Sequence, residues 1–206
     1  MIKEIRYETP VDDIAKIKGK VIFLAGPTVR GNQQHLTSWR FEAIEELKKQ
    51  GFDGTVIIPE FTSKSESDKG KEWIPLWEFE GLKRAAIILF WLPRTRELIG
   101  LTTNWEHGYW VGKHQDKMIY GRPDDAYRIG YLDIMWKAAA KYVGHIESPI
   151  FTTLEDTIKA TIAAVDRVTC KLCGEVSNPS IHGGCDEWQN EKCNWHLVFP
   201  ESTIIN

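Results

Sequence analysis

The sequence predicts an α/β fold in which a parallel sheet is covered by helices on both faces. Short apolar runs rich in β-branched residues alternate with helix-like stretches along the chain. One of these runs, AIILFWL, contains no polar residue, and a continuously apolar strand is typical of a sheet buried on both sides. The 206 residues, 42% of them hydrophobic, suffice for one full domain and a small appendage.

The first predicted unit is a strand, a polar loop and a helix. The run from Lys20 to Gly26 (KVIFLAG) is apolar and ends in a Gly-Pro breaker, which predicts a buried strand. Ser38 follows the polar loop and is typical of a helix N-cap. Apolar residues then recur at helical spacing over 39–50, and Gly51 marks the end of this helix.

The alternation continues to residue 168. The further predicted strands run from Thr55 to Pro59, from Ala86 to Leu92 and from Lys117 to Gly121. One predicted helix runs from about Ile74 to Arg84, another starts near Trp105, and a third runs from Thr153 to Val168. Strands that alternate with helices in this way form a parallel sheet.

Charge and composition narrow the class of partner. The formal net charge of -3 and the pI of about 6.1 indicate no basic surface of the kind that holds nucleic acid through its phosphates. The first 20 residues contain no apolar segment typical of a signal peptide. No run approaches the ~20 apolar residues of a membrane span. We therefore expect a cytoplasmic protein with a small-molecule partner, without a membrane or nucleic-acid partner.

Three loops that follow predicted strands have a high polar content. They read AGPTVRG, PEFTS and PRTRELIGLTTNWEHG. Because ligands of open α/β sheets bind outside the carboxyl ends of the strands, we expect the three loops to converge on one crevice. Gly26 and Pro27 form the turn of the first loop, where a residue without a side chain allows a ligand to approach the backbone; a tight turn needs glycine equally often.

The chain resembles the nucleoside 2-deoxyribosyltransferase-like family from about Val21 to Asp133. The resemblance rests on the order and spacing of FLAGPTVR, SWRFEA, VIIPEF, the WE of LWEFEGL, ILFWLPR, GLTTNWEHGYW and YGRPDDA. It implies a flavodoxin-like doubly wound sheet, chemistry at the N-glycosidic bond of a nucleoside or nucleotide, and a homo-oligomer. It also implies a glutamate nucleophile in the E-x-G of the third loop, which is Glu106. We expect no organic cofactor.

Glu106 has the chemistry that this role requires. In the first turn of a helix that starts near Trp105, its carboxylate would meet the helix dipole and free backbone amides, which favour the ionised form. An ionised carboxylate can attack an anomeric carbon. The alternative is a glutamate that favours a helix start for reasons of charge alone. Transfer to a second base and hydrolysis use the same nucleophile, so both stay open.

The residues just before Glu106 are candidates for substrate contacts. Thr102, Thr103 and Asn104 offer hydroxyl and amide groups for sugar hydroxyls or a leaving base, with Asn104 nearest the chemistry. The alternative for Thr103 or Asn104 is a helix cap.

A second acid is expected for proton transfer to the base. The family usually has an aspartate at the start of the strand that here begins with Ala86, so Glu78 or Glu60 is the candidate replacement. For both glutamates the alternative is a solvated or salt-bridged scaffold residue. The missing aspartate also motivates an alternative function, a protein that senses a nucleotide without turning it over.

Arginines and tryptophans near the same loops are candidate substrate ligands. Arg30, Arg40 and Arg94 would favour a phosphorylated substrate if they converge, because guanidinium groups bind phosphate through two hydrogen bonds. Each has the alternative of an ion pair with a scaffold glutamate. Trp91 and Trp39 are candidates for stacking on a base, and core packing is the alternative for both.

The last 38 residues differ from the rest and contain all four cysteines. We place a boundary between a catalytic domain, 1–168, and a zinc-binding segment, 169–206. CxxC followed by CxxH is a common structural-zinc spacing, and the expected ligands are Cys170, Cys173, Cys193 and His196. His182 and Cys185 form a competing second half. A protein or nucleic-acid adaptor built on this segment is a weaker alternative, because the charge of the segment is mixed.

Overall fold

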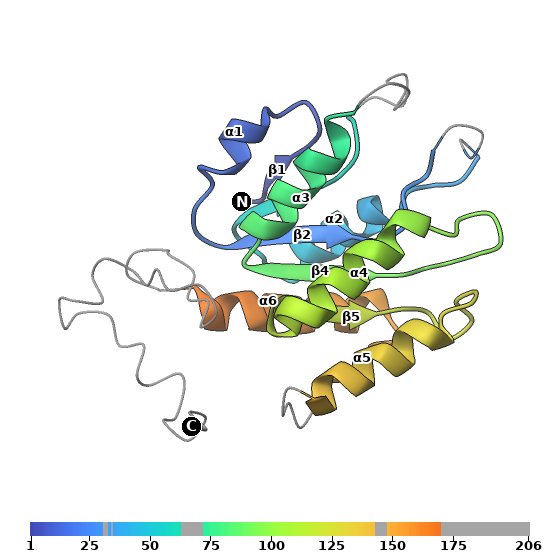
Figure 1. Cartoon of the computed structure of the whole chain (residues 1–206). Coiled ribbons are helices and arrows are strands. Elements are labelled where there is room, and N and C mark those ends of the chain that lie inside the picture. The colour runs from blue at the N-terminus through green and yellow to red at the C-terminus, as the bar shows by residue number, and fades with distance from the viewer. Residues whose placement is uncertain (31–32, 34, 63–71, 143–147, 170–206) are drawn as a thin grey trace, which may run out of the picture.

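A computed structural model describes most of the chain up to residue 169. The described residues are 1–30, 33, 35–62, 72–142 and 148–169. They form one sheet of five strands in the order β1-β3-β2-β4-β5, and every neighbouring pair is parallel. This arrangement fits the predicted flavodoxin-like fold (Figure 1).

The strands and helices alternate as predicted, with additional elements at the N-terminus and after β5. The strands are β1 (Lys3–Ile5), β2 (Val21–Ala25), β3 (Thr55–Ile57), β4 (Ile87–Trp91) and β5 (Met118–Gly121). The helices are α1 (Val11–Ile14), α2 (Trp39–Lys49), α3 (Ile74–Arg84), α4 (Leu101–His114), α5 (Gly130–Tyr142) and α6 (Leu154–Val168). A short 3-10 turn, Gln115–Lys117, joins α4 to β5.

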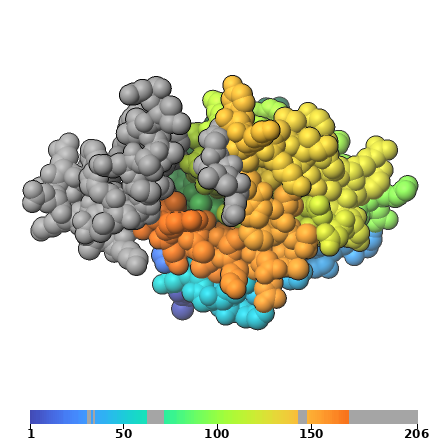
Figure 2. Space-filling model, turned by 90° about the horizontal axis from the view of Figure 1, so that it is seen from below, coloured from blue at the N-terminus to red at the C-terminus, as the bar shows by residue number. Residues whose placement is uncertain are grey.

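The centre of the sheet is apolar because helices cover both of its faces. All five residues of β2 and all five of β4 are buried, and the two strands pair from Ile22 with Ile87 to Ala25 with Phe90. Alternate residues of β2 enter different core clusters: Phe23 packs with α3, α4 and α5, whereas Leu24 packs with α2 and α6. Figure 1 shows α3 and α4 in front of the strands, and Figure 2 shows α6 on the lower face.

Four features of the fold were not predicted. The N-terminal segment forms β1, which pairs with β3, and a short α1 that contacts α3. After β5, α5 buries Leu132, Trp136 and Ala140, which recur every fourth residue. The prediction that a helix starts near Trp105 was wrong, because α4 already begins at Leu101.

No helix in the described part of the chain is long and apolar enough to cross a membrane.

Candidate active site

A cavity lies at the carboxyl ends of β2, β3 and β4, where the three polar loops meet. It encloses about 230 Å³ of empty space, including its open mouth. The lining residues come from β2 and the loop after it, from the start of α2, from the end of β3, and from α3 and α4. They are Phe23, Ala25, Gly26, Thr28, Arg30, Arg40, Pro59, Glu78, Thr102, Thr103 and Glu106.

Two glycines hold the walls of this cavity close together. A Cβ on Gly26 would lie 2.2 Å from the backbone oxygen of Trp91 and 2.8 Å from the Trp39 ring. Gly100, which precedes α4, has a left-handed backbone with φ of 64°, and a Cβ there would lie 3.0 Å from Pro27. Both positions therefore need glycine for packing between loops, in addition to any close approach by a ligand.

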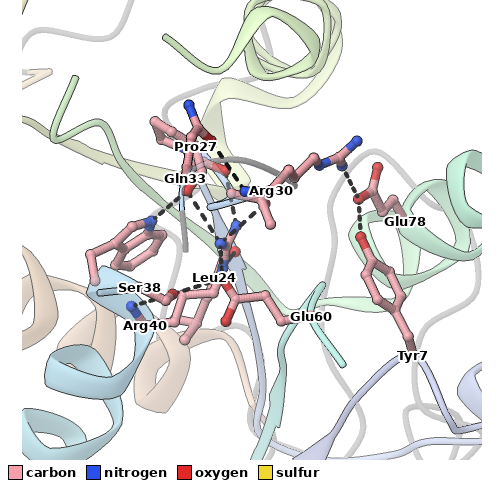
Figure 3. A network of polar contacts seen from close by, with 12 residues as sticks. Tyr7, Leu24, Pro27, Arg30, Gln33, Ser38, Arg40, Glu60 and Glu78 are labelled. Atoms are coloured by element: carbon pink, nitrogen blue, oxygen red, sulfur yellow. Dashed lines mark hydrogen bonds and ion pairs between the residues drawn. The ribbon is translucent and has the colours of Figure 1, made fainter. Parts of the chain in front are cut away.

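Arg40 organises the loop after β2. Its side chain is 2% exposed, and its guanidinium donates to the backbone oxygens of Leu24 (3.0 Å), Gly26 (2.9 Å) and Pro27 (3.3 Å) (Figure 3). Nη1 also lies 2.8 Å from a carboxyl oxygen of Glu60. Arg40 and Glu60 thus form a buried ion pair that holds the loop, which is the scaffold role given above as the alternative to substrate binding.

The start of α2 belongs to the same scaffold. Ser38 caps the helix by accepting from the backbone amide of Arg40 (3.2 Å) and donates to Glu60 (2.6 Å). The indole of Trp39 donates to the backbone oxygen of Pro27 (3.1 Å). Glu60, Trp39 and Pro27 do not line the cavity.

Glu106 reaches the cavity from the second turn of α4. Helical spacing places it on the same face as Thr102 and Thr103, which line the cavity beside it. Burial and, after it, the negative charge of Glu78 together raise the pKa of the Glu106 carboxyl to about 7. Arg40 and Arg30 oppose these two effects. The expected first-turn position, which would favour the ionised form, is not observed, because α4 begins at Leu101 and Glu106 lies in its second turn.

Glu78 faces the same cavity from α3. Its side chain is 13% exposed, and its Oε1 accepts a hydrogen bond from the hydroxyl of Tyr7 (Figure 3). A guanidinium nitrogen of Arg30 lies 3.9 Å from the same oxygen. Burial and the charge of Glu78 both raise the pKa of Tyr7, so its hydroxyl keeps its proton. Tyr7 was not predicted, because no motif near the N-terminus indicates this contact.

Comparison with known protein families decides the family of this chain. Residues 19–125 match the family model described as nucleoside 2-deoxyribosyltransferase like, which is just over half of the 206 residues. The chain belongs to the nucleoside 2-deoxyribosyltransferase-like family. The comparison with curated proteins gave no match. Every cavity-lining residue lies inside the matched range of the nucleoside 2-deoxyribosyltransferase-like family, whereas Tyr7 lies outside it.

Besides Glu60 and Pro27, three further predicted site residues of this family member do not line the cavity. Arg94 is 5% exposed, and its guanidinium donates to the side-chain oxygen of Asn104; neither residue lines the cavity. Trp91 is buried in the core cluster that packs against α2 and α6. Of the three arginines expected to converge, the cavity has Arg30 and Arg40.

Ala86, where the family usually has an aspartate, lies at the opposite end of the sheet from the cavity. Ala86 is 2% exposed and precedes β4, whereas the cavity is at the carboxyl end of the strand. Five strand residues span roughly 16 Å, which a carboxylate side chain does not bridge. The alanine therefore removes no acid from the cavity, and it is no reason to prefer a sensor over an enzyme.

The predicted zinc ligands lie outside the described residues. These are Cys170, Cys173, Cys193 and His196, and the competing pair His182 and Cys185 lies in the same segment. Within the ranges that the structure describes, no group of three or more His, Cys, Asp or Glu residues is arranged to hold a metal ion.

Proposed function

We propose that this protein breaks the N-glycosidic bond of a nucleoside or nucleotide, with Glu106 as the attacking carboxylate. Membership of the family supports glycosyl transfer on nucleosides as the class of reaction. The observation behind the finer proposal is the pair of carboxyl groups, Glu106 and Glu78, that face one cavity from two different helices. Two carboxyl groups with different partners are what a nucleophile and a proton donor at a glycosidic bond require.

The proposed reaction has two steps. An oxygen of ionised Glu106 forms a bond to the anomeric carbon, and the electrons of the carbon–nitrogen bond pass to the base. The two glutamates share one proton in this state: it lies on Glu78 while Glu106 is ionised, and Glu78 gives it to the departing base and becomes a carboxylate. A second base or a water molecule then attacks the same carbon, gives up a proton to Glu78, and releases Glu106. The two outcomes are transfer and hydrolysis.

Hydroxyl groups around Glu106 suit a sugar. Thr28, Thr102 and Thr103 line the cavity and offer both donors and acceptors. They are the proposed contacts of the sugar hydroxyls. Asn104 and Trp91, which we expected at the substrate, have no place in this proposal because neither lines the cavity.

A phosphate group on the substrate is supported by two features. Arg30 lines the cavity with a side chain that is 42% exposed and that also lies 3.9 Å from Glu78. The first turn of α4, which includes Thr102 and Thr103, follows Gly100 and has no side-chain cap. Uncapped backbone amides at a helix start favour an anion. We therefore propose nucleoside monophosphates as preferred substrates.

The release of free base tests the proposal. Purified protein is incubated with ribo- and deoxyribonucleosides and with their 5′-monophosphates, and the products are separated by chromatography. We expect base from at least one substrate and a loss of about a thousandfold or more in Glu106→Gln, because a removed nucleophile costs rates of this order. A second base added to the mixture distinguishes transfer from hydrolysis.

The matched control is Glu80→Gln, which changes a glutamate on α3 that pairs with Lys83 and does not line the cavity. It should release base at the wild-type rate. The proposal is wrong if no substrate yields base, or if Glu106→Gln is as active as the wild type.

A further inference from the structure

Tyr7 is buried beside the cavity and belongs to a segment that the family match does not include. It follows β1, its side chain is 5% exposed, and its hydroxyl donates to Oε1 of Glu78. The guanidinium of Arg30 approaches the same carboxyl oxygen at 3.9 Å. Both of these contacts are made to Oε1, and in the proposed reaction Oε2 is the oxygen that holds the proton for the substrate.

Several contacts fix the tyrosine ring in place. The ring centroid lies 4.9 Å from that of Phe61 and 4.9 Å from that of Trp77, which is on α3 with Glu78. The backbone amide of Tyr7 donates to the backbone oxygen of Glu60 (3.3 Å), and the indole of Trp77 donates to the backbone oxygen of Thr9 (2.9 Å). The segment after β1 is therefore held to the loop after β3 at Tyr7 and to α3 at Thr9.

We propose that Tyr7 is a positioning residue, which holds the carboxyl group of Glu78 so that its Oε2 proton reaches the departing base. This inference rests on the proposed function and extends it to a residue that the family match does not cover. A glutamate side chain has three rotatable bonds, and a hydrogen bond to a buried, immobile hydroxyl selects one orientation. Tyr7 itself neither touches the substrate nor gives up its proton.

The inference predicts that the effect of Tyr7 depends on the leaving group. The base of an unmodified purine nucleoside needs a proton as the glycosidic bond breaks. The base of an N7-methylated purine nucleoside already carries a positive charge, so it leaves as a neutral molecule without a proton. Tyr7→Phe removes only the hydroxyl and keeps the ring contacts. We expect kcat to fall about ten- to hundredfold for the unmodified nucleoside and to change less than about threefold for the methylated one, with KM unchanged for both.

A second variant keeps the test independent of folding. Glu78→Gln should show the same dependence on the leaving group, and adding Tyr7→Phe to it should cause no further loss, because the two residues act as one unit. The matched control is Tyr120→Phe, since the hydroxyl of Tyr120 also donates to a carboxylate, Asp133 (2.7 Å), but does not line the cavity. Tyr120→Phe should leave the ratio of kcat for the unmodified nucleoside to kcat for the methylated one unchanged.

The outcomes are separable. If Tyr7→Phe slows both nucleosides equally, or if its loss adds fully to that of Glu78→Gln, the tyrosine has a structural role and the inference is overturned. An unchanged kcat for the unmodified nucleoside also overturns it. A wild type that releases base normally in either case leaves the proposed function standing, whereas a wild type that releases no base from any nucleoside or 5′-monophosphate, methylated or unmodified, overturns both.

Discussion

At the scale of single residues, the negative charge of Glu78 affects the protonation of Glu106. Glu106 is half-buried, and the pKa of its carboxyl is raised to about 7 by burial and by the negative charge of Glu78. If Glu106 is the nucleophile that we propose, only its ionised form is active, and the unliganded protein at neutral pH is divided between the two protonation states. Arg30 and Arg40 limit the shift, because their positive charges lower the same pKa.

The rate of base release should therefore depend on pH through Glu106. Raising the pH through about 7 ionises Glu106, so kcat/KM should increase over this range and level off above it. Glu78→Gln removes a negative charge that raises the pKa of Glu106, so the midpoint of this increase should move to lower pH. The profile is measured with an N7-methylated purine nucleoside, which does not need the proton of Glu78. A midpoint that stays in place or moves to higher pH would contradict this coupling.

The candidate nucleophile was predictable from the sequence, but part of its setting was not. The TTNWE spacing places Thr102, Thr103 and Glu106 on one helical face, and this follows from local periodicity. Tyr7 contacts Glu78 across 71 residues of chain, and no local pattern encodes such a contact. No local pattern encodes the partner of Arg94 either: only the packed structure shows that its guanidinium donates to Asn104.

At the scale of elements, the loop after β2 depends on one buried arginine. Arg40 bonds three backbone oxygens and the carboxylate of Glu60, so its removal would leave these buried acceptors without a donor. Because Gly26 and Thr28 of this loop line the cavity, the same bonds shape the cavity wall.

We expect Arg40→Ala to lower the free energy of unfolding by about 3–5 kcal/mol, the usual effect of breaking a buried ion pair. Chemical denaturation followed by tryptophan fluorescence measures the change. Lys48→Ala provides the comparison, because Lys48 pairs with Glu45 on the surface of the same helix and an exposed ion pair contributes little to stability. Equal effects of the two substitutions would show that Arg40 does not hold the loop.

Element boundaries were predictable where burial was continuous. The runs that became β2 and β4 are apolar throughout, and both were placed within two residues of their observed ends. β1 has three residues with only Ile5 buried, which is too short for a pattern to show. The start of α4 was predicted four residues late, because its first turn exposes Leu101 and Thr102 instead of burying apolar side chains.

At the scale of the whole molecule, the C-terminal segment remains a prediction from sequence. Cys170, Cys173, Cys193 and His196 would form a closed tetrahedral site without an open position for chemistry. We expect about one zinc per chain by elemental analysis, with a loss of metal in Cys170→Ser and Cys193→Ser. His182→Ala should retain zinc if the CxxH pair is the second half. A wild type that contains no metal would contradict the prediction.

The homo-oligomer that the family resemblance implies also stays a prediction. Exposed apolar side chains lie on α3 and α4 near the cavity: Leu76 is 69% exposed, Leu101 74% and Trp105 61%. Trp105 precedes Glu106 in the sequence and stacks on Tyr109, with 5.3 Å between the ring centroids. If a second copy contacts this face, it lies beside the proposed nucleophile.

The central claim is that Glu106 forms a covalent bond to the sugar, and mass spectrometry of the quenched reaction tests it most directly. The protein is mixed with a substrate, quenched in acid during turnover, digested and analysed peptide by peptide. We predict a glycosyl adduct on the peptide that contains Glu106 in the wild type and in Glu80→Gln, and no adduct in Glu106→Gln. Release of base without an adduct on Glu106, at a rate that Glu106→Gln does not change, would contradict the account.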